Sequence, residues 1–221
     1  MNRKEFLRNA AILGASVPIF GTLLAGCQKN EAIFQNIPSN FNGKVLIIGA
    51  GAAGITAGYI LEKQGIDFQI IEAAPNYGGR IKKIEGFADF PIDLGGEWIH
   101  TDPKILSTLV NDPEVDAAVE VINYNPQDIY VMKNGRLVPR HFVTYFYSEY
   151  KFKQSTWFDF FDTYFVPSVR DKMVLNSPVQ SINHSGDQVI VQTSDAEYVG
   201  DKVIVTVPIK ILQEGMIEFT P

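Results

Sequence analysis

KVLIIGAGAAGITAGYILEKQGIDFQIIE, residues 44–72, combines the signals of a strand, a tight turn, a helix and a second strand. Residues 44–48 form a short apolar run rich in β-branched side chains, which is typical of a strand buried on both faces of a parallel sheet. The helix is expected to begin within the glycine-rich turn and to run to Gly65, a residue type that commonly follows a helix. Residues 66–71 predict the second strand, which ends just before Glu72. The stretch therefore predicts a βαβ unit of a parallel α/β sheet.

Three glycines of the turn each suit a different requirement of a dinucleotide site. Gly49 allows the tight turn, Gly51 lets the backbone approach a pyrophosphate, and Gly54 lets the helix pack against the strand. The first N–H groups of the helix and the positive end of its dipole would face the phosphates. Glu72 stands where such sites place an acid that accepts hydrogen bonds from a ribose. The alternative for the glycine pattern alone is a turn without ligand, but its surroundings favour nucleotide binding.

The composition predicts a folded body without metal or disulfide chemistry. The chain has 221 residues, of which 46% are hydrophobic and 20% charged, enough for one domain or a domain with an insertion. Its formal net charge of −6 argues against a general nucleic-acid-binding protein, which requires clustered Lys and Arg. Cys27 is the only cysteine, which excludes an internal disulfide and a cysteine-based metal site. The three histidines are too scattered for metal-ligand spacing, so no metal is expected.

Residues 1–27 have the pattern of an export signal. Basic residues precede an apolar stretch, residues 10–25, that glycine and proline interrupt. A membrane-spanning helix is the alternative, although the run is shorter than the ~20 residues that a bilayer requires. Residues 28–42 are largely polar and predict a tether.

The end of this segment, Leu24-Ala25-Gly26-Cys27, resembles the lipobox of bacterial lipoproteins. The resemblance implies lipidation at Cys27 and a membrane anchor that holds the body in the periplasm or at the cell surface of a bacterium. Residues 2–7 also resemble a twin-arginine signal, with Lys4 in place of the second arginine. Both export routes, twin-arginine and general secretory, therefore stay open.

A resemblance to a known family becomes specific after the second strand. Its motifs are the glycine turn, Glu72-Ala73, Gly78-Gly79-Arg80 and Asp93-Leu94-Gly95-Gly96-Glu97-Trp98-Ile99-His100. In this order and spacing they resemble the FAD-binding half of the flavin-containing amine oxidase family, and the Trp-Ile-His ending is most similar to its polyamine oxidase branch. The resemblance implies a Rossmann-like α/β FAD-binding domain (GR2-type flavoprotein fold) with a β-meander and a short, aromatic-rich helical insertion. It also implies non-covalent FAD, an amine substrate and oxygen as partner.

The residues expected to bind FAD come from these motifs and from one later position. Arg80 could pair with a diphosphate, and Gly95-Gly96 lets main chain approach a flat ring that Trp98 could wall. A solvated arginine and a buried core tryptophan are the alternatives. His100 is open between a substrate-facing group and an ordinary partly buried histidine. The complete expected set is Gly49, Ala50, Gly51, Ala53, Gly54, Glu72, Ala73, Gly79, Arg80, Gly95, Gly96, Glu97, Trp98 and Val179.

Residues 101–173 predict an insertion that supplies part of a substrate region. Residues 102–122 are expected to form short helices interrupted by two prolines. Residues 128–138 predict a hairpin, because Asn134-Gly135 suits a type I′ turn. Residues 142–165 hold twelve aromatic side chains, which could line a pocket for an apolar or cationic substrate or could fill a core.

Residues 174–221 predict a return to β structure. Three runs separated by turn residues favour a β-meander, and they span residues 174–182, 188–193 and 198–207. The resemblance implies that Val179 meets the adenine and that residues 203–208 form a strand returning to the sheet. The expected organisation is an export signal (1–27), a tether (28–42), an FAD-binding βαβ core (43–100), the insertion (101–173) and the meander (174–221).

The resemblance covers residues 43–221 but only the first part of the family. The family's catalytic lysine, the aromatic pair around the amine and the last FAD-binding segment have no counterpart, so no catalytic residue is assigned. The favoured interpretation is an FAD-dependent amine oxidase, in which hydride moves from the carbon next to an amine nitrogen to flavin. The alternatives are a truncated FAD-binding module, for which a partner chain would supply the rest, and an FAD-dependent desaturase or other oxidoreductase of the same fold.

Overall fold

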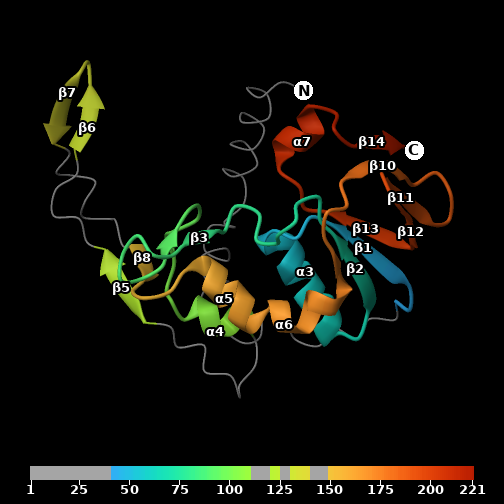
Figure 1. The fold of residues 1–221 in the computed structure, drawn as a ribbon, viewed down its shortest axis with the longest axis horizontal. Helices are drawn as coiled ribbons and strands as arrows, with labels where there is room; N and C mark the ends of the chain where they lie inside the picture. Colours follow the sequence, from blue (N-terminus) through green and yellow to red (C-terminus); the bar gives the residue numbers. More distant parts are fainter. Residues whose placement is uncertain (1–40, 111–119, 125–129, 140–148) are drawn as a thin grey trace, which may run out of the picture. The chain divides into compact units, whose positions relative to one another are not determined.

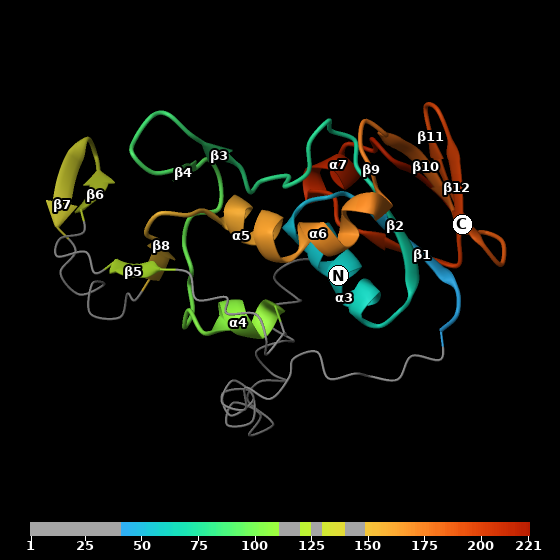
Figure 2. The ribbon, with the colours of Figure 1, turned by 60° about the horizontal axis from the view of Figure 1, so that its bottom comes forward.

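Figures 1 and 2 show the computed structural model, which describes residues 41–110, 120–124, 130–139 and 149–221. The expected export signal, the lipidation at Cys27 and most of the tether lie outside these residues and stay predictions. Within the described ranges, no helix combines the length and the apolar character that crossing a membrane requires.

Short strands and helices follow one another along the chain, and Figure 1 labels most of them. The elements are, in chain order, β1 Lys44–Ile48, α3 Ala52–Lys63, β2 Asp67–Ile71, β3 Lys83–Ile84, β4 Ile92–Asp93, α4 Ile105–Val110, β5 Val121–Tyr124, β6 Tyr130–Lys133, β7 Arg136–Pro139, β8 Glu149–Phe152, α5 Trp157–Tyr164, α6 Val166–Val169, the 3₁₀-helix η2 Arg170–Lys172, β9 Met173–Val174, β10 Val179–Asn183, β11 Val189–Thr193, β12 Glu197–Gly200, β13 Lys202–Val205, α7 Ile209–Gln213 and β14 Glu218–Thr220.

A four-stranded parallel sheet, with strand order β13-β1-β2-β9, contains the predicted βαβ unit. Helix α3 connects β1 to β2 and packs against both. Ile48 at the end of β1 is in register with Ile71 of β2 and with Val205 of β13. Three strands therefore end at one carboxyl edge, which is where ligands bind in open α/β sheets.

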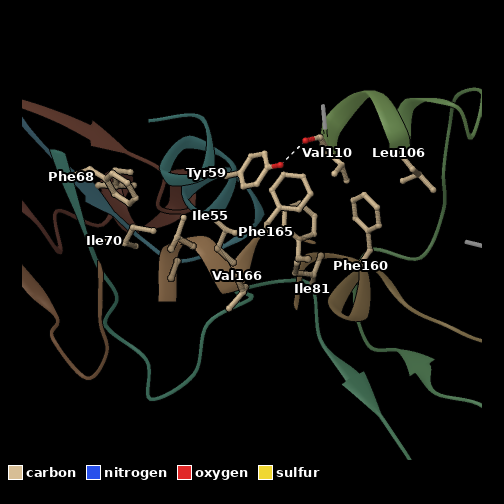
Figure 3. Close-up of a cluster of buried hydrophobic side chains, with 14 of the residues drawn as sticks. Ile55, Tyr59, Phe68, Ile70, Ile81, Leu106, Val110, Phe160, Phe165 and Val166 are labelled. Atoms are coloured by element: carbon tan, nitrogen blue, oxygen red, sulfur yellow. Dashed lines mark hydrogen bonds between the residues drawn. The ribbon is translucent and has the colours of Figure 1, made fainter. Parts of the chain in front are cut away.

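Strand β1 is buried on both faces, as its apolar run predicted. Val45 and Ile47 belong to one hydrophobic cluster, and the alternate residues Leu46 and Ile48 belong to another on the opposite face. Figure 3 shows part of the first cluster, where side chains of β2, α3, α4, α5 and α6 meet. The hydroxyl of Tyr59 donates a hydrogen bond to the carbonyl of Val110 at 2.5 Å, which ties α3 to the end of α4 (Figure 3).

The second cluster joins the parallel sheet to another four-stranded sheet, of order β12-β11-β10-β14. Strands β10, β11 and β12 form the expected antiparallel meander, and β14 pairs with β10 in parallel. The predicted run 198–207 is not one strand, because it breaks at Asp201 between β12 and β13. Strand β13 then pairs with β1, so the expected return to the parallel sheet is present in the structure. Gly200 permits this crossing, since a Cβ there would lie 2.8 Å from Leu46 Cγ.

The insertion is partly as expected. The hairpin β6-β7 is confirmed, with positive φ angles of 50° at Asn134 and 73° at Gly135, as a type I′ turn requires. The helical interpretation of residues 102–122 is right for α4 but wrong for Val121 and Ile122, which lie in β5 and pair with β8. Both residues are β-branched and suit a paired strand. Residues 111–119 of that prediction lie outside the described ranges.

Helix α3 ends at Lys63, two residues before the predicted Gly65, and its cap explains the glycine. Gly65 has a φ of 67° and donates its N–H to the carbonyl of Glu62 at 3.0 Å, while Ile66 donates to the carbonyl of Leu61 at 3.0 Å. These two bonds form a Schellman motif, in which a left-handed residue reverses the chain. Gly65 therefore directs the chain from α3 into β2.

Candidate functional site

The carboxyl edge of the parallel sheet brings Gly49, Glu72 and Thr206 together, because each follows the end of a strand in register. Gly49 donates its N–H to the carbonyl of Ile71 at 2.8 Å. The hydroxyl of Thr206 lies 2.8 Å from the carbonyl oxygen of Ile48 and 3.1 Å from that of Gly49. Thr206 thus fixes the start of the glycine turn from β13. The sequence analysis did not assign it a role, although its position one residue beyond a sheet strand was the available signal.

The glycine turn places backbone where side chains would not fit. Gly49 has a φ of 104°, which a residue with a side chain rarely adopts. A Cβ at Gly54 would lie only 1.9 Å from the carbonyl oxygen of Gly49, so this glycine allows α3 to start against the turn. Gly51 is the N-cap residue of α3, and no side chain in the described part of the chain caps the helix there. The first turn of α3 contains no acidic residue. The positive end of the helix is therefore available for an anion.

A second glycine loop, Gly78-Gly79, lies against the first. Gly78 donates its N–H to the carbonyl of Ala50 at 2.8 Å. Gly78 and Gly79 have positive φ angles of 103° and 58°, and a Cβ at Gly79 would come within 3.1 Å of the Cα of Gly51. Residues 49–51 and 78–79 together form what we call the glycine cradle, in which two stretches of backbone meet without side chains between them.

Glu72 holds the cradle to the end of β2. One carboxylate oxygen accepts the N–H of Ala50 at 2.6 Å and the other accepts the N–H of Ala74 at 2.8 Å. A carboxylate has about four lone-pair sites, so two acceptor positions remain for a further donor such as a ribose hydroxyl. The acid that the sequence selected is thus directed at the glycine turn, at the sheet edge where it was expected.

The remaining residues expected at the phosphates lie open at the cradle. Ala53, Ala73, Gly79 and Arg80 are all exposed, so a ligand can reach them. Among the described residues, the guanidinium of Arg80 forms no ion pair with a carboxylate. A diphosphate could therefore be met by backbone N–H groups and by an exposed guanidinium.

Gly95 has a packing role that the sequence did not reveal. A Cβ at Gly95 would lie 1.8 Å from the carbonyl oxygen of Arg80, and Leu94 donates its N–H to the carbonyl of Lys82 at 2.8 Å. The β4 segment thus lies directly on the backbone that follows the second glycine loop. Gly96 is less restricted, since the nearest atom to a Cβ there is 3.9 Å away, on Ile81. The expected approach of these glycines to a flat ring stays a prediction.

The residues that follow, Glu97 to His100, contact β8 through an isolated backbone bridge between Ile99 and Tyr150 and through their side chains. Lys151 Nζ lies 3.1 Å from a carboxylate oxygen of Glu97 and 5.9 Å from the ring centre of Trp98, which is half-buried. His100 Nδ1 lies 2.7 Å from a carboxylate oxygen of Glu149, with the histidine side chain 71% exposed and the glutamate buried. His100 is therefore an exposed histidine held by a buried acid, and Trp98 is neither fully buried nor free.

Val179, the residue expected at the adenine, begins β10 and is buried in the cluster between the two sheets. Its side chain shares that cluster with Leu46, Ile48 and Ile71. These contacts account for its apolar character through packing, and its contact with an adenine stays a prediction.

The described aromatic residues of the insertion mainly fill a core. Phe160, Phe161 and Phe165 are buried, with ring centres 4.8 Å apart for Phe161 and Phe165. Trp157 and Tyr164 pack against the same cluster. This arrangement favours core filling over a substrate pocket for α5 and α6, and residues 140–148 lie outside the described ranges.

Asp93 is a carboxylic acid of this region whose pKa is strongly shifted by its surroundings. Burial is the main cause that raises the pKa of its carboxyl to about 6, and nearby Glu97 and Asp159 raise it as well. The backbone N–H of Trp157, which donates to the carboxylate at 3.1 Å, acts in the opposite direction and lowers the pKa. Because the pKa in the folded state is above the ordinary value, the folded state binds this proton more tightly. The stability from Asp93 is complete below about pH 4 and is lost as the pH rises through about 6.

Asp93→Asn is therefore expected to stabilise the protein by about 1 to 2 kcal/mol at pH 8 and to have little effect at pH 4, since asparagine still accepts the Trp157 N–H without a charge. Urea unfolding at the two pH values measures this difference. Asp187→Asn, in an exposed turn, is the control and should show no such pH dependence. An equal effect of Asp93→Asn at both pH values would contradict the prediction.

Comparison with known proteins identifies relatives of this chain. The model of a family described as flavin containing amine oxidoreductase matches residues 52–157 and 162–221. A probable flavin-containing monoamine oxidase A of Dictyostelium discoideum is 29% identical over 96 residues, covering 41% of this chain and 21% of that protein. A nicotine dehydrogenase of Pseudomonas putida is 28% identical over 133 residues, covering 56% of this chain and 27% of that protein.

A solved structure, cyclohexylamine oxidase from Brevibacterium oxydans, superimposes with a TM-score of 0.60 at 16% identity, covering 81% of this chain and 60% of that one. With the family match, this likeness confirms the expected Rossmann-like α/β FAD-binding fold with its meander and aromatic-rich helical insertion. The chain spans about a fifth to a quarter of the length of the two curated relatives.

Proposed function

The chain belongs to the flavin containing amine oxidoreductase family, and from this membership we propose that it binds FAD without a covalent link and oxidises an amine. The observation that carries the proposal is the glycine cradle at the carboxyl edge of the sheet. Its two backbones approach so closely that a Cβ at Gly79 would lie 3.1 Å from Gly51 Cα. Bare backbone beside a helix start is suited to a diphosphate, which accepts several N–H groups at once.

Each end of the cradle has a group suited to one part of the dinucleotide. The first N–H groups of α3 and the guanidinium of Arg80 would hold the two phosphates, because both supply positive charge at exposed positions. Glu72 would accept the hydroxyls of the adenosine ribose with the lone pairs that Ala50 and Ala74 leave free. These residues bind and orient the cofactor.

The flavin end of the site is assigned to the segment that begins at Gly95. Gly95 and Gly96 are exposed and carry no side chain, so main chain at this point can lie flat against a ring, and half-buried Trp98 can shield it from water. Flavin supplies, when bound, the capacity to take a hydride from the carbon next to an amine nitrogen and to return the electrons to oxygen. The protein's part is to bind, orient and exclude water.

The purified chain is expected to carry visible flavin absorbance, and denaturation is expected to release FAD into the supernatant, where mass spectrometry identifies it. We expect this because the backbone N–H groups of α3, Arg80 and Glu72 lie together at the carboxyl edge of the parallel sheet, where they would bind the phosphates and the ribose of FAD. Flavin that stays with the denatured chain would contradict the non-covalent link. No flavin on purification and none bound on titration with FAD would contradict the proposed function as a whole.

The electron acceptor needs a separate assay, because the relatives include both an oxidase and a dehydrogenase. Peroxide formed from a panel of mono- and polyamines supports oxygen as acceptor. Turnover seen only with an artificial dye would favour a dehydrogenase. Bound FAD with no turnover under either condition would select the binding-module alternative.

A further inference from the structure

We propose that helix α5 of the insertion positions the second glycine loop for the diphosphate, by holding the loop at two points through Tyr77 and Lys83. We call residues 77–83 the strap. The inference rests on the proposed function. It adds positioning residues on α5, a helix of the insertion to which no part in binding the cofactor has been assigned.

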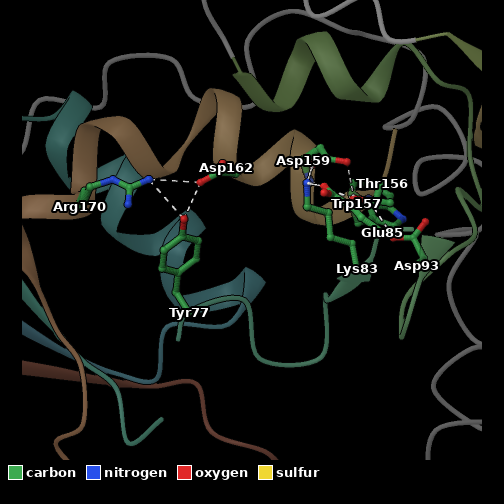
Figure 4. Close-up of polar contacts among 9 residues, drawn as sticks. All are labelled: Tyr77, Lys83, Glu85, Asp93, Thr156, Trp157, Asp159, Asp162 and Arg170. Carbon is green, nitrogen blue, oxygen red and sulfur yellow. Dashed lines mark hydrogen bonds and ion pairs between the residues drawn. The ribbon is translucent and has the colours of Figure 1, made fainter. Parts of the chain in front are cut away.

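The first anchor is Tyr77, directly before the glycine loop. Its hydroxyl donates to a carboxylate oxygen of Asp162 on α5 at 2.5 Å, and Arg170 donates to the same oxygen at 3.2 Å and to the tyrosine oxygen at 3.3 Å (Figure 4). The ring of Tyr77 stacks on Phe158, with ring centres 5.7 Å apart and planes 5° from parallel. Burial, and the hydrogen bond to Asp162 after it, raise the pKa of Tyr77, which keeps the donor proton in place at neutral pH.

The second anchor is Lys83, the first residue of β3 and the last residue of the strap. Its Nζ lies 2.6 Å from a carboxylate oxygen of Asp159, also on α5 (Figure 4). The same Nζ lies 5.8 Å from the ring centre of Phe158. Asp159 is itself fixed by the N-terminus of α5, since its other oxygen accepts the hydroxyl of Thr156 at 2.8 Å. The hydrogen bond to Asp159 raises the pKa of Lys83, so this cation stays charged.

Between the anchors, the strap lies against the helix. A Cβ at Gly78 would come within 3.2 Å of the Phe158 ring, and Ile81 is buried in the core that α5 helps to form. On its other side, Gly78 bonds to Ala50 of the glycine turn. The spacing of the two halves of the cradle therefore depends on α5. A displacement of α5 would change the cradle without altering any residue that touches the phosphates.

The test measures binding of ADP, of adenosine and of FAD to the flavin-free full chain by titration calorimetry and by quenching of flavin fluorescence. Tyr77→Phe keeps the stacked ring and loses the hydroxyl bond. It is expected to weaken ADP and FAD binding about 5- to 10-fold, somewhat less than the full worth of one hydrogen bond to a charged group, because the loss reaches the cradle only through the strap. Adenosine, which lacks the diphosphate, should bind as before. Lys83→Met is expected to have the same effects: weaker binding of ADP and FAD, and unchanged binding of adenosine.

The matched control is Tyr59→Phe, which also removes a tyrosine hydroxyl bond, to the Val110 carbonyl in the core. It should lower thermal stability at least as much as Tyr77→Phe and leave all three affinities unchanged. A double-mutant cycle of Tyr77→Phe with Asp162→Ala should give effects on ADP binding that are clearly less than multiplicative, because each change removes the same hydrogen bond.

Three different results overturn the inference. In the first, wild type and Tyr77→Phe bind ADP and FAD equally well. This result rejects the positioning role of the strap and leaves the proposed function standing. Equal weakening of adenosine and ADP would show general damage rather than positioning and would also reject that role. A wild-type chain that binds none of the ligands would overturn the strap together with the proposed function.

Discussion

Gly54→Ala is expected to abolish FAD binding and to destabilise the fold by at least about 3 kcal/mol, the largest effect among the single substitutions considered. The added methyl would lie 1.9 Å from the carbonyl oxygen of Gly49 and 3.0 Å from the hydroxyl of Thr206. A carbonyl in a hydrogen-bonded turn cannot move aside as a flexible side chain can. The helix would have to shift away from β1, and its first N–H groups would leave the cradle. Chemical unfolding and FAD titration measure the two losses.

Gly79→Ala separates the binding effect from the folding effect. Its Cβ would approach Gly51 Cα at 3.1 Å, but the loop is exposed, so the fold should tolerate the change while FAD binds at least about tenfold more weakly. Gly186→Ala is the control, because the nearest atom to a Cβ there is 3.9 Å away and its φ is not positive; its effect should stay within about 0.5 kcal/mol. Normal FAD affinity in Gly79→Ala would remove the second loop from the site.

The sequence was sufficient for the parts of the fold that local chemistry decides. The apolar β-branched run at residues 44–48 predicted a strand with both faces buried, and it is the strand between β13 and β2. Asn134-Gly135 predicted its turn because few other pairs adopt two positive φ angles. The end of the helix was predicted two residues late, because Gly65 signals the reversal that follows the helix rather than its last turn.

Long-range contacts decide what the sequence could not show. The run 198–207 was predicted as one strand. The tertiary structure shows that Gly200 passes Leu46 and that Asp201 accepts the Lys44 N–H at 2.7 Å, where the chain changes sheets. Tyr77 and Asp162 are 85 residues apart, and no local pattern predicts their hydrogen bond. Gly95 was expected to matter for a ligand, whereas its observed constraint is the backbone of Arg80.

Among the candidate site residues, those on the βαβ unit were the easiest to predict, because strand register carries them to one edge. Gly49 and Glu72 follow paired residues of β1 and β2, so their proximity comes from the sheet itself. Glu97, Trp98 and His100 depend instead on side-chain contacts with β8, and Glu97 is 54 residues from its partner Lys151. Their contacts with Glu149 and Lys151 therefore needed the structure.

Glu72→Ala is expected to weaken FAD and ADP binding about 100-fold, the effect of losing two or more hydrogen bonds to a charged group. The carboxylate has two tasks: it binds the N–H groups of Ala50 and Ala74, and its free lone pairs face the position proposed for the ribose. Alanine removes both tasks. FMN, which lacks the AMP half of FAD and so has no adenosine ribose for Glu72 to bind, should lose less affinity than FAD and ADP. Glu197→Ala, on exposed β12, is the matched control and should change neither affinity.

Glu72→Gln distinguishes the two tasks of this side chain. Its amide oxygen can still accept one backbone N–H, but its NH₂ group would face the other N–H, so one of the two bonds at the turn is replaced by a repulsive contact. An intermediate loss of about tenfold in ADP affinity is therefore expected, with part of the thermal stability retained. If adenosine binds equally well to wild type, Glu72→Ala and Glu72→Gln, the ribose is held elsewhere. Glu72 would then serve only to shape the turn, and the proposed mode of dinucleotide binding would have to be replaced.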